Sequence, residues 1–404
     1  MSEPLVIVGN GMASMRLVEE LVQRALGRYA IAVVGDEPRL AYNRVLLSSV
    51  LAREVSQDEI ELKTAAWWRD RGVTLLYGRR AVSMDPAIRR LRLADGASLP
   101  FAKLVLATGS RPIRPAVPGM NLPGVLTFRD LGDVAAIEQA AKPGSKAVVI
   151  GGGLLGLEAA YGLAKAGAQV SVVHLMDRLM ERQLDARAAA MLRRAIEARG
   201  IAVHLQAETK AIRGERHAQA VALADGTTLA ADLVVVAAGI RPNTDLARSA
   251  GVEIGRGILI DDHLRTSNPD IYAIGECAEH SGVCYGLVEP AYEQARALAA
   301  HLCGGAGDYR GSVLATNLKV SGVNLFSAGD FLGAPGTEQI VLSDAGLGTY
   351  KKLVIKDGCL VGAVLYGDTL DGLWYLNLIR AGASIEAIRD DIVFGRAFAE
   401  RKAA

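Results

Sequence analysis

The chain has 404 residues, half of them hydrophobic, and its 45 lysines and arginines balance 44 aspartates and glutamates for a formal net charge of +1. This length predicts two or three domains, and the dispersed, near-neutral charge argues against nucleic acid or a membrane surface as a partner. The apolar runs are shorter than the roughly 20 residues of a membrane span. The four cysteines form no CxxC pair, so we expect no metal site and no dithiol pair.

The first elements are predicted to form a βαβ unit: a strand at 5–8, a helix at 12–26 and a strand at 30–34. Because the first strand begins at Leu5, we expect no signal peptide and a cytoplasmic location. Downstream we expect helices near 44–52 and 64–71, short strands around 73–93, a buried strand in 103–112 and a proline-rich linker at 111–119.

A second βαβ unit begins at Ala147, with a helix at 155–166, a strand at 168–175 and a long helix near 185–199. Its closing segment "DLVVVAAGIRPN" (232–243) repeats the pattern of "KLVLATGSRP" (103–112): a strand, a turn of small residues, then Arg-Pro. A helix follows near 290–302, and the pattern from about 311 onward predicts antiparallel strands plus helices. We therefore expect an α/β protein with two Rossmann-like dinucleotide-binding domains and a C-terminal α+β domain.

The segment Gly151–Gly156, called here the second cradle, carries the GxGxxG pattern at Gly151, Gly153 and Gly156. The first glycine permits a tight turn, the second lets backbone approach a pyrophosphate, and the third lets the helix pack on the strand. The helix N-terminus offers N–H groups to the phosphates. A glycine turn without a ligand is the alternative, but the strand before it and the helix after it favour binding.

The segment Gly9–Ser14, called here the first cradle, has Gly9, Gly11 and a serine at the third small position, Ser14. Asp36 and Glu37 close the strand that follows, where dinucleotide folds place a ribose-binding carboxylate. Either residue could instead be a solvated turn residue. We favour Asp36.

The corresponding strand of the second unit ends at His174 instead of an acid. A surface histidine without a role is one interpretation. The other is weakened discrimination between NADH and NADPH, with Arg178 or Arg182 as phosphate partners.

Together, the two cradles, "LVLATGSRP", "VVVAAGIRPN" and "TSNPDIYAIGE" resemble the FAD-dependent pyridine nucleotide oxidoreductases over about residues 4–302. "AYNRVLLSSVL" (41–51) and "VVHLMDRLMERQLD" (172–185) are similar to the NAD(P)H-accepting flavin portion of the assimilatory nitrite reductase large subunit and to nitrate-assimilation electron-transfer subunits. The segment after about 311 resembles the interface domain of this group.

The resemblance implies an FAD-binding domain at 1–112 and 244–310, an NAD(P)H-binding domain at 113–243 and an interface domain at 311–404. It implies FAD contacts from Gly9, Gly11, Ser14, Asp36, Glu37, Arg44, Thr108, Gly109, Arg111, Gly275 and Glu276. Glu276 stands where the family has aspartate on the ribityl chain, so its reach is one methylene longer. For NAD(P)H it implies contacts from Gly151, Gly153 and Gly156. His174 and Gly239 are further candidate cofactor-binding residues.

Two glutamates are candidates near the flavin by family order. Glu158, inside the helix of the second cradle, would lie at the nicotinamide–flavin contact and is the candidate catalytic residue. Its alternative is a dipole-stabilised helix glutamate without a ligand. Glu289 or Tyr292, in the 286–302 segment, would also approach the flavin.

Relatives with a thiol relay carry cysteine where this chain has Leu47-Ser48-Ser49, and no cysteine precedes Cys277. A thiol relay is therefore not expected. The ferredoxin-reductase branch has lysine where Ser49 stands, which weakens that assignment. The full nitrite reductase continues into iron–sulfur and sirohaem segments, and this chain has no such cysteine cluster.

The resulting expectation is an oxidoreductase, a diaphorase that passes electrons from NADH or NADPH through FAD to a separate redox protein. A nitrate or nitrite reductase subunit is the first expected partner, and rubredoxin or ferredoxin the second. The other classes considered are an NAD(P)H- and FAD-binding sensor or scaffold, and an oxidase that acts directly on oxygen.

Overall fold

A computed structural model describes residues 2–320 and 322–400. These residues form two compact units. The first unit comprises the chain up to Leu47 together with Val55–Arg111 and Ile240–Ser312. The second comprises Ser48–Glu54, Pro112–Gly239 and the chain from Val313 onward.

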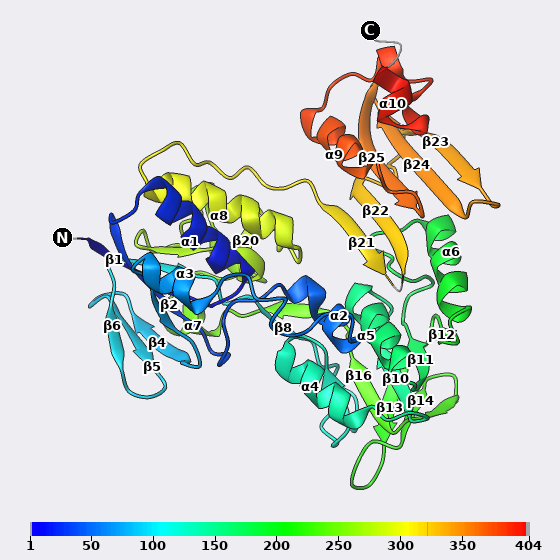
Figure 1. Cartoon of the computed structure of the whole chain (residues 1–404), viewed down its shortest axis with the longest axis horizontal. Coiled ribbons are helices and arrows are strands. Elements are labelled where there is room, and N and C mark those ends of the chain that lie inside the picture. Colours follow the sequence, from blue (N-terminus) through cyan, green and yellow to red (C-terminus); the bar gives the residue numbers. More distant parts are fainter. Residues whose placement is uncertain (1, 321, 401–404) are drawn as a thin grey trace. The chain divides into compact units, whose positions relative to one another are not determined.

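The first unit is built on a parallel sheet in the order β19-β7-β1-β2-β3. Its strands are β1 (Glu3–Val8), β2 (Tyr29–Val34), β3 (Thr74–Leu76), β7 (Lys103–Leu106) and β19 (Ile271–Ala273). The β1 strand reads as an apolar run, as a strand buried on both faces should. The α1 helix (Met12–Arg24) buries Met15, Leu17, Val18 and Leu21, and it lies beside α8 (Val288–Leu302) (Figure 1).

Smaller elements complete this unit. An antiparallel sheet joins β4 (Ala81–Asp85), β5 (Arg90–Leu93) and β6 (Ser98–Pro100), and β18 (Ile258–Ile260) pairs in parallel with β20 (Ala278–His280). Two further strands, β8 (Ser110–Pro112) and β17 (Ile240–Pro242), pair with each other. The short helices are η1 (Arg44–Leu46), α3 (Ala65–Asp70), α7 (Asp245–Ser249) and η2 (Gly275–Cys277).

The second unit contains a parallel sheet of the same kind in the order β12-β11-β10-β16-β9. Its strands are β9 (Val125–Thr127), β10 (Lys146–Ile150), β11 (Gln169–Val173), β12 (Ala202–His204) and β16 (Leu233–Val236). The helices are α4 (Leu131–Ala140), α5 (Leu154–Lys165) and α6 (Ala186–Glu197), and α2 (Leu47–Leu51) lies largely in this unit. A small antiparallel sheet follows: β13 (Thr209–Arg213), β14 (Ala220–Leu223) and β15 (Thr228–Ala230).

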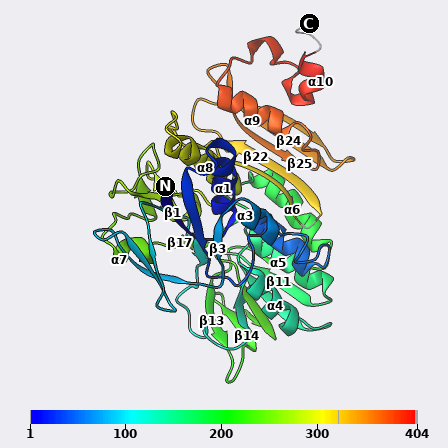
Figure 2. The same cartoon turned by 60° about the vertical axis from the view of Figure 1, so that its left-hand side comes forward.

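The C-terminal part of the second unit is an antiparallel sheet in the order β21-β22-β25-β24-β23. Its strands are β21 (Ala315–Val320), β22 (Val323–Gly329), β23 (Glu338–Asp344), β24 (Thr349–Lys356) and β25 (Cys359–Tyr366). The α9 helix (Gly372–Ala381) packs along β22 and β25 (Figure 2), and η3 (Glu386–Ile388), η4 (Ile392–Phe394) and α10 (Arg396–Ala399) follow it.

The predicted fold class is confirmed: two parallel dinucleotide-type sheets and a C-terminal antiparallel sheet with helices are present. The predicted strand and small-residue turn are present in both 103–112 and 232–243. Each segment forms two strands separated by three residues, because a glycine with positive φ turns the chain there, Gly109 at 64° and Gly239 at 107°. The three-domain division stays a prediction. Among the described residues, no helix is both long enough and apolar enough to cross a membrane.

Candidate functional site

The first cradle joins β1 to α1 by a turn that only glycine can make. Gly9 has φ 116°, and a Cβ added there would overlap the carbonyl oxygen of Ala107 on the neighbouring strand. Gly11 is the N-cap of α1 and provides no side-chain cap for the first N–H groups. Apart from its two chain neighbours, no residue of the described part of the chain has an atom within 4 Å of an added Cβ at Gly11. Free N–H groups beside open space fit a pyrophosphate.

Ser14 takes the third small position of the first cradle without disturbing it. Its side chain is buried, and its hydroxyl donates to the Gly9 carbonyl oxygen at 2.5 Å. Asn10 lies between these residues, and its Nδ2 donates to the Arg39 carbonyl oxygen at 3.1 Å. Its Oδ1 is buried and has no hydrogen-bond partner within the part of the chain that the structure describes. An unpartnered acceptor in the cradle is consistent with a ligand that supplies a donor.

The two candidate acids that follow β2, Asp36 and Glu37, have different environments. Glu37 is half-buried, accepts a hydrogen bond from the Tyr42 hydroxyl at 2.7 Å and pairs with Arg44. Asp36 is exposed. The sequence favoured Asp36, whereas the structure holds Glu37 in a fixed geometry and brings it to the predicted cofactor residue Arg44. The ribose role of either acid stays a prediction.

Glu276 and the turn after β7 come together in the first unit. The Ser110 hydroxyl donates to Glu276 Oε2 at 2.7 Å. Gly109 is close to the same oxygen, because a Cβ added at Gly109 would lie 4.0 Å from Glu276 Oε2. The N–H of Gly275, whose φ is 79°, donates to Oε1 of the buried Gln294 at 2.7 Å. The predicted residues of "ATGS" and "AIGE" therefore form one cluster.

Three other predicted residues have structural partners. The Thr108 hydroxyl donates to the Asn243 carbonyl oxygen at 2.8 Å, and Asn243 Nδ2 returns a bond to the Thr108 carbonyl oxygen at 2.8 Å. Arg111 pairs with Asp245 on α7 at 2.8 Å. Glu289 is half exposed on α8 and pairs with Arg296 at 3.0 Å. These contacts neither require nor exclude a cofactor.

The second cradle repeats the geometry of the first. Gly151 has φ 127°, and an added Cβ would overlap the Ala237 carbonyl oxygen. At Gly156 an added Cβ would overlap the Gly151 carbonyl oxygen, so α5 can approach the turn only with glycine there. Gly153 is the N-cap of α5 and gives no side-chain cap. Within the residues that the structure describes, and apart from its chain neighbours, no atom lies within 4 Å of an added Cβ there. The three glycines thus meet the three requirements of a dinucleotide turn.

His174 lies under the second cradle and is buried, not on the surface. The Gly152 N–H donates to its Nδ1 at 3.0 Å, and its Nε2 lies 3.1 Å from Glu181 Oε2. The ring therefore joins the glycine turn to a carboxylate seven residues further along the chain.

Glu158 is buried on α5, and desolvation raises the pKa of its carboxyl group to about 8 against the opposing effect of a hydrogen bond with Ser48. The α2 segment approaches α5 closely here, since a Cβ on Gly162 would lie 2.7 Å from Leu51 Cγ. Burial, and not the helix dipole that the sequence suggested, dominates the environment of Glu158. Its acid form is therefore the main form at neutral pH.

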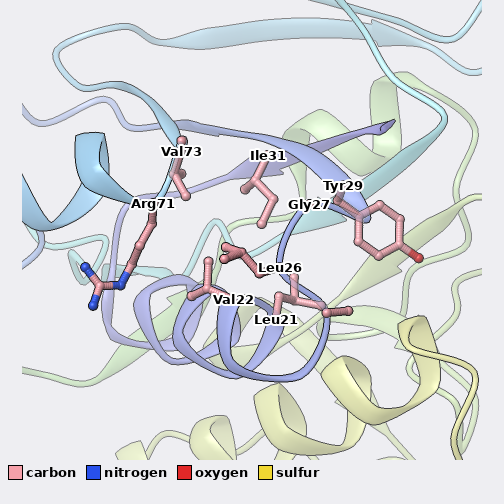
Figure 3. Close-up of a pocket in the computed structure, with 10 residues that line it drawn as sticks. Leu21, Val22, Leu26, Gly27, Tyr29, Ile31, Arg71 and Val73 are labelled. Atoms are coloured by element: carbon pink, nitrogen blue, oxygen red, sulfur yellow. The ribbon is translucent and has the colours of Figure 1, made fainter. Parts of the chain in front are cut away.

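Figure 3 shows a pocket between the end of α1, β2 and the loop before β3. Its wall is mostly apolar, with Leu21, Val22 and Leu26 on one side and Ile31 and Val73 on the other (Figure 3), and Arg71 also lines it. Arg71 stacks on Trp67, 4.4 Å from the ring centroid. No predicted site residue lines this pocket. Among the described residues, no group of three or more histidine, cysteine and acidic side chains is placed to hold a metal ion.

Comparison with known families agrees with the geometry of the cradles. Residues 3–297 match the pyridine nucleotide-disulphide oxidoreductase family, and residues 315–383 match the rubredoxin NAD+ reductase C-terminal domain. The first of these families uses FAD and NAD(P)H. The paired cradles, with their open second glycines and uncapped helices, fit two such dinucleotides.

Relatives and solved structures extend the match over nearly the whole chain. The chain is 44% identical over 94% of its length to nitrite reductase [NAD(P)H] of Bacillus subtilis, and 41% identical over 96% to the assimilatory nitrate reductase electron transfer subunit of that organism. It spans about half of those two proteins, 48% and 51% of their lengths. The ferredoxin reductase for the CYP199A2 system from Rhodopseudomonas palustris superposes with a TM-score of 0.89, 29% identity and full coverage of both chains.

Sequence reasoning missed several residues that the structure brings to these positions. Asn10 and Ser110 lie inside quoted motifs and could have been noticed as polar groups in them. Tyr42 and Glu181 also lie inside quoted motifs, and Gln294 lies in the 286–302 segment, but nothing in these segments predicts their partners, because tertiary contacts determine them.

Proposed function

The chain belongs to the pyridine nucleotide-disulphide oxidoreductase family, and on that premise we propose that it is an FAD-containing NAD(P)H oxidoreductase that passes electrons to a separate redox protein. The observation that carries this proposal is the presence of two dinucleotide cradles of the same geometry in one chain. Bound FAD would supply an acceptor for a hydride from the nicotinamide and a donor of electrons to the partner.

The first unit provides the binding groups for FAD in this proposal. The N–H groups of the first turn of α1 hold the pyrophosphate, since Gly11 leaves them uncapped. Glu276, oriented by Ser110, accepts hydrogen bonds from the ribityl hydroxyls. Glu37, fixed by Tyr42 and Arg44, accepts hydrogen bonds from the adenosine ribose.

The second unit provides the binding groups for NAD(P)H. The first turn of α5 holds the pyrophosphate at Gly153. Glu158 keeps a proton on its buried carboxyl group at neutral pH, so it places a neutral hydrogen-bonding group, not a charge, near the nicotinamide. Hydride transfer itself requires orientation and no side-chain acid or base.

A thiol relay has no part in this proposal. The α2 segment carries Ser48 and Ser49, and no cysteine precedes Cys277. Two electrons therefore leave for an external acceptor instead of an internal disulfide.

For the acceptor we propose a redox centre of nitrate or nitrite assimilation, supported by the 44% and 41% identity to the two Bacillus subtilis proteins. A rubredoxin or ferredoxin is the second candidate, favoured by the match of residues 315–383 to the rubredoxin reductase C-terminal domain. A cytoplasmic location, where NADH and NADPH are available as electron donors, is part of this proposal.

The proposed function is tested by following NADH and NADPH oxidation by the FAD-loaded protein with ferricyanide, with a rubredoxin, with a ferredoxin and with oxygen alone. We expect fast turnover with ferricyanide, turnover with one of the protein acceptors, and slow oxygen uptake. Turnover with oxygen as fast as with ferricyanide would indicate an oxidase, and no turnover with any acceptor would indicate a binding or sensing protein.

A further inference from the structure

In the second βαβ unit, the position at which dinucleotide folds place a ribose-binding carboxylate is occupied by a buried histidine. β11 ends at Val173, and His174 follows directly with 8% of its surface exposed. Its ring packs beneath Gly152, where an added Cβ would lie 2.7 Å from the ring Cγ. A ring held under the turn cannot itself present a hydrogen-bonding edge to a ribose above it.

The hydrogen bonds of the ring fix its tautomer. Because the Gly152 N–H donates to Nδ1 at 3.0 Å, Nδ1 carries no hydrogen. Nε2 therefore carries it and donates to Glu181 Oε2 at 3.1 Å. This bond orients the Glu181 carboxylate, whose side chain is 23% exposed and whose other oxygen is a further acceptor.

The backbone brings Glu181 back to the cradle. The Met180 N–H donates to the Gly152 carbonyl oxygen at 3.0 Å, and Met180 is buried with a positive φ of 50°. Gly152 is thus bonded on both sides to the segment that follows β11. This segment carries Glu181 to the carboxyl end of β11, the edge where the missing acid would stand.

Of the two candidate phosphate-binding arginines, Arg178 is already paired with an acid, and Arg182 is exposed. Arg178 Nη1 lies 3.0 Å and 3.2 Å from the two carboxylate oxygens of its neighbour Asp177. A carboxylate at the strand end accepts hydrogen bonds from the ribose hydroxyls of NADH and repels the 2′-phosphate of NADPH.

We propose that Glu181 recognises the adenosine ribose of the pyridine nucleotide and makes the protein prefer NADH to NADPH, with His174 as its positioning residue. This inference rests on the proposed function, since it concerns the nucleotide that the second cradle is proposed to bind. It replaces the weakened discrimination that the histidine suggested in the sequence.

The test compares ADP-ribose with 2′-phospho-ADP-ribose, two probes that differ only in the phosphate, by calorimetry on the FAD-loaded protein. Loading with FAD keeps both probes out of the first cradle. We expect wild type to bind ADP-ribose at least about tenfold more tightly, because a hydrogen bond to a charged group discriminates by about that factor. Glu181→Gln should bring the ratio of the two dissociation constants toward one, and Glu181→Arg should reverse it.

The matched control is Glu215→Gln, an exposed glutamate in the turn between β13 and β14, which should leave the ratio unchanged. His174→Leu tests the positioning role, because general damage to the turn weakens both probes and leaves their ratio intact, whereas loss of the Glu181 orientation lowers the ratio. A wild-type protein that binds both probes equally or favours the phosphorylated one, or a Glu181→Gln ratio equal to wild type, overturns this inference alone. Binding of neither probe to wild type overturns the proposed function together with it.

Discussion

The Ser110 hydroxyl donates a hydrogen bond to Glu276 Oε2 at 2.7 Å and so fixes a carboxylate where β7 and β19 end in the first unit. The two residues are 166 positions apart in the chain. Their contact joins the "ATGS" and "AIGE" motifs. Because the hydrogen bond holds the carboxylate, the side chain of glutamate has a defined position although it is one methylene longer than aspartate.

FAD affinity should depend on this carboxylate. Replacing Glu276 with alanine removes an acceptor for the ribityl hydroxyls, and we expect FAD binding to weaken about 10- to 100-fold, the effect of losing hydrogen bonds to a charged group. Ser110→Ala should weaken it less, because the carboxylate stays and only its orientation is lost. Flavin fluorescence titration of the apoprotein measures both. Glu253→Ala, at an exposed position of the same unit, is the control, and equal affinity of the Glu276 variant and this control would contradict the assignment.

The two open glycines should separate the two cofactors. Apart from the two chain neighbours, an added Cβ at Gly11 or Gly153 meets no atom of the described residues within 4 Å, so we expect valine at either position to leave the fold intact. Gly11→Val should abolish FAD retention, whereas Gly153→Val should keep FAD and abolish its reduction by NADH. Absorbance spectra and thermal unfolding of the two variants check this. A Gly11→Val protein that keeps its flavin would show that no pyrophosphate lies against that turn.

At Gly9, unlike Gly11 and Gly153, an added side chain has no space. A Cβ at this position would overlap the Ala107 carbonyl oxygen, and the backbone has φ 116°. Gly9→Ala should therefore destabilise the folded protein itself by about 2 kcal/mol or more, which denaturant unfolding of the apoprotein measures. Unfolding midpoints of Gly9→Ala and Gly11→Val that coincide would contradict the distinction between a structural and a ligand-facing glycine.

Glu158 should make stability depend on pH. Its folded pKa, about 8, lies above its ordinary value of 4.5 because burial disfavours the charge. Between these pH values the unfolded carboxyl group loses its proton while the buried one keeps it, so the free energy of unfolding falls as pH rises from about 4.5 to 8, by about 3–5 kcal/mol in all. Glu158→Gln should be stabilised relative to wild type at pH 8 and not at pH 4.5. Unfolding curves of wild type and Glu158→Gln at both pH values measure this difference in stability. A difference that is the same at pH 4.5 and pH 8 would contradict the burial of the carboxyl group.

Asp185 couples the C-terminal sheet to α6 in the second unit. One carboxylate oxygen accepts from the Ala188 N–H and caps the helix, and the other accepts from the buried Tyr350 hydroxyl at 2.6 Å. Lys352 Nζ lies 3.7 Å from that second oxygen. Burial and this carboxylate raise the pKa of Tyr350.

Removing this carboxylate should cost more than removing the hydroxyl. Tyr350→Phe loses one hydrogen bond, worth about 1–2 kcal/mol, whereas Asp185→Ala also loses the helix cap and leaves Lys352 without its acid, for about 3 kcal/mol or more. Chemical denaturation compares the two variants. If Tyr350→Phe lowered the free energy of unfolding as much as Asp185→Ala, the helix cap and the Lys352 ion pair would contribute nothing to stability, which would contradict this prediction.

The glycine spacing predicted both cradles, because the turn at Gly9 or Gly151 and the close approach of α5 at Gly156 are steric requirements that the local sequence encodes. Apolar runs of the right length predicted the parallel strands for the same reason. These features depend on residues near one another in the chain, which is why their positions could be read directly.

The surroundings of the charged site residues could not be predicted in the same way. Burial of His174 depends on the fold of the segment that follows it. The raised pKa of Glu158 results from its burial in the folded chain, which outweighs the opposing hydrogen bond with Ser48, more than a hundred positions away. The ion pair of Glu37 and Arg44 also required the intervening turn to close. The sequence identified which residues belong to the site, and tertiary contacts determine their chemistry.

Electron transfer from the nicotinamide to the flavin is tested most directly by an anaerobic titration of the FAD-loaded protein with NADH and, in parallel, with NADPH, followed at the flavin absorbance. The account predicts stoichiometric bleaching by about one equivalent of NADH, with NADPH acting more slowly. A protein that retains no flavin after reconstitution, or a bound flavin that neither nucleotide bleaches, would contradict it.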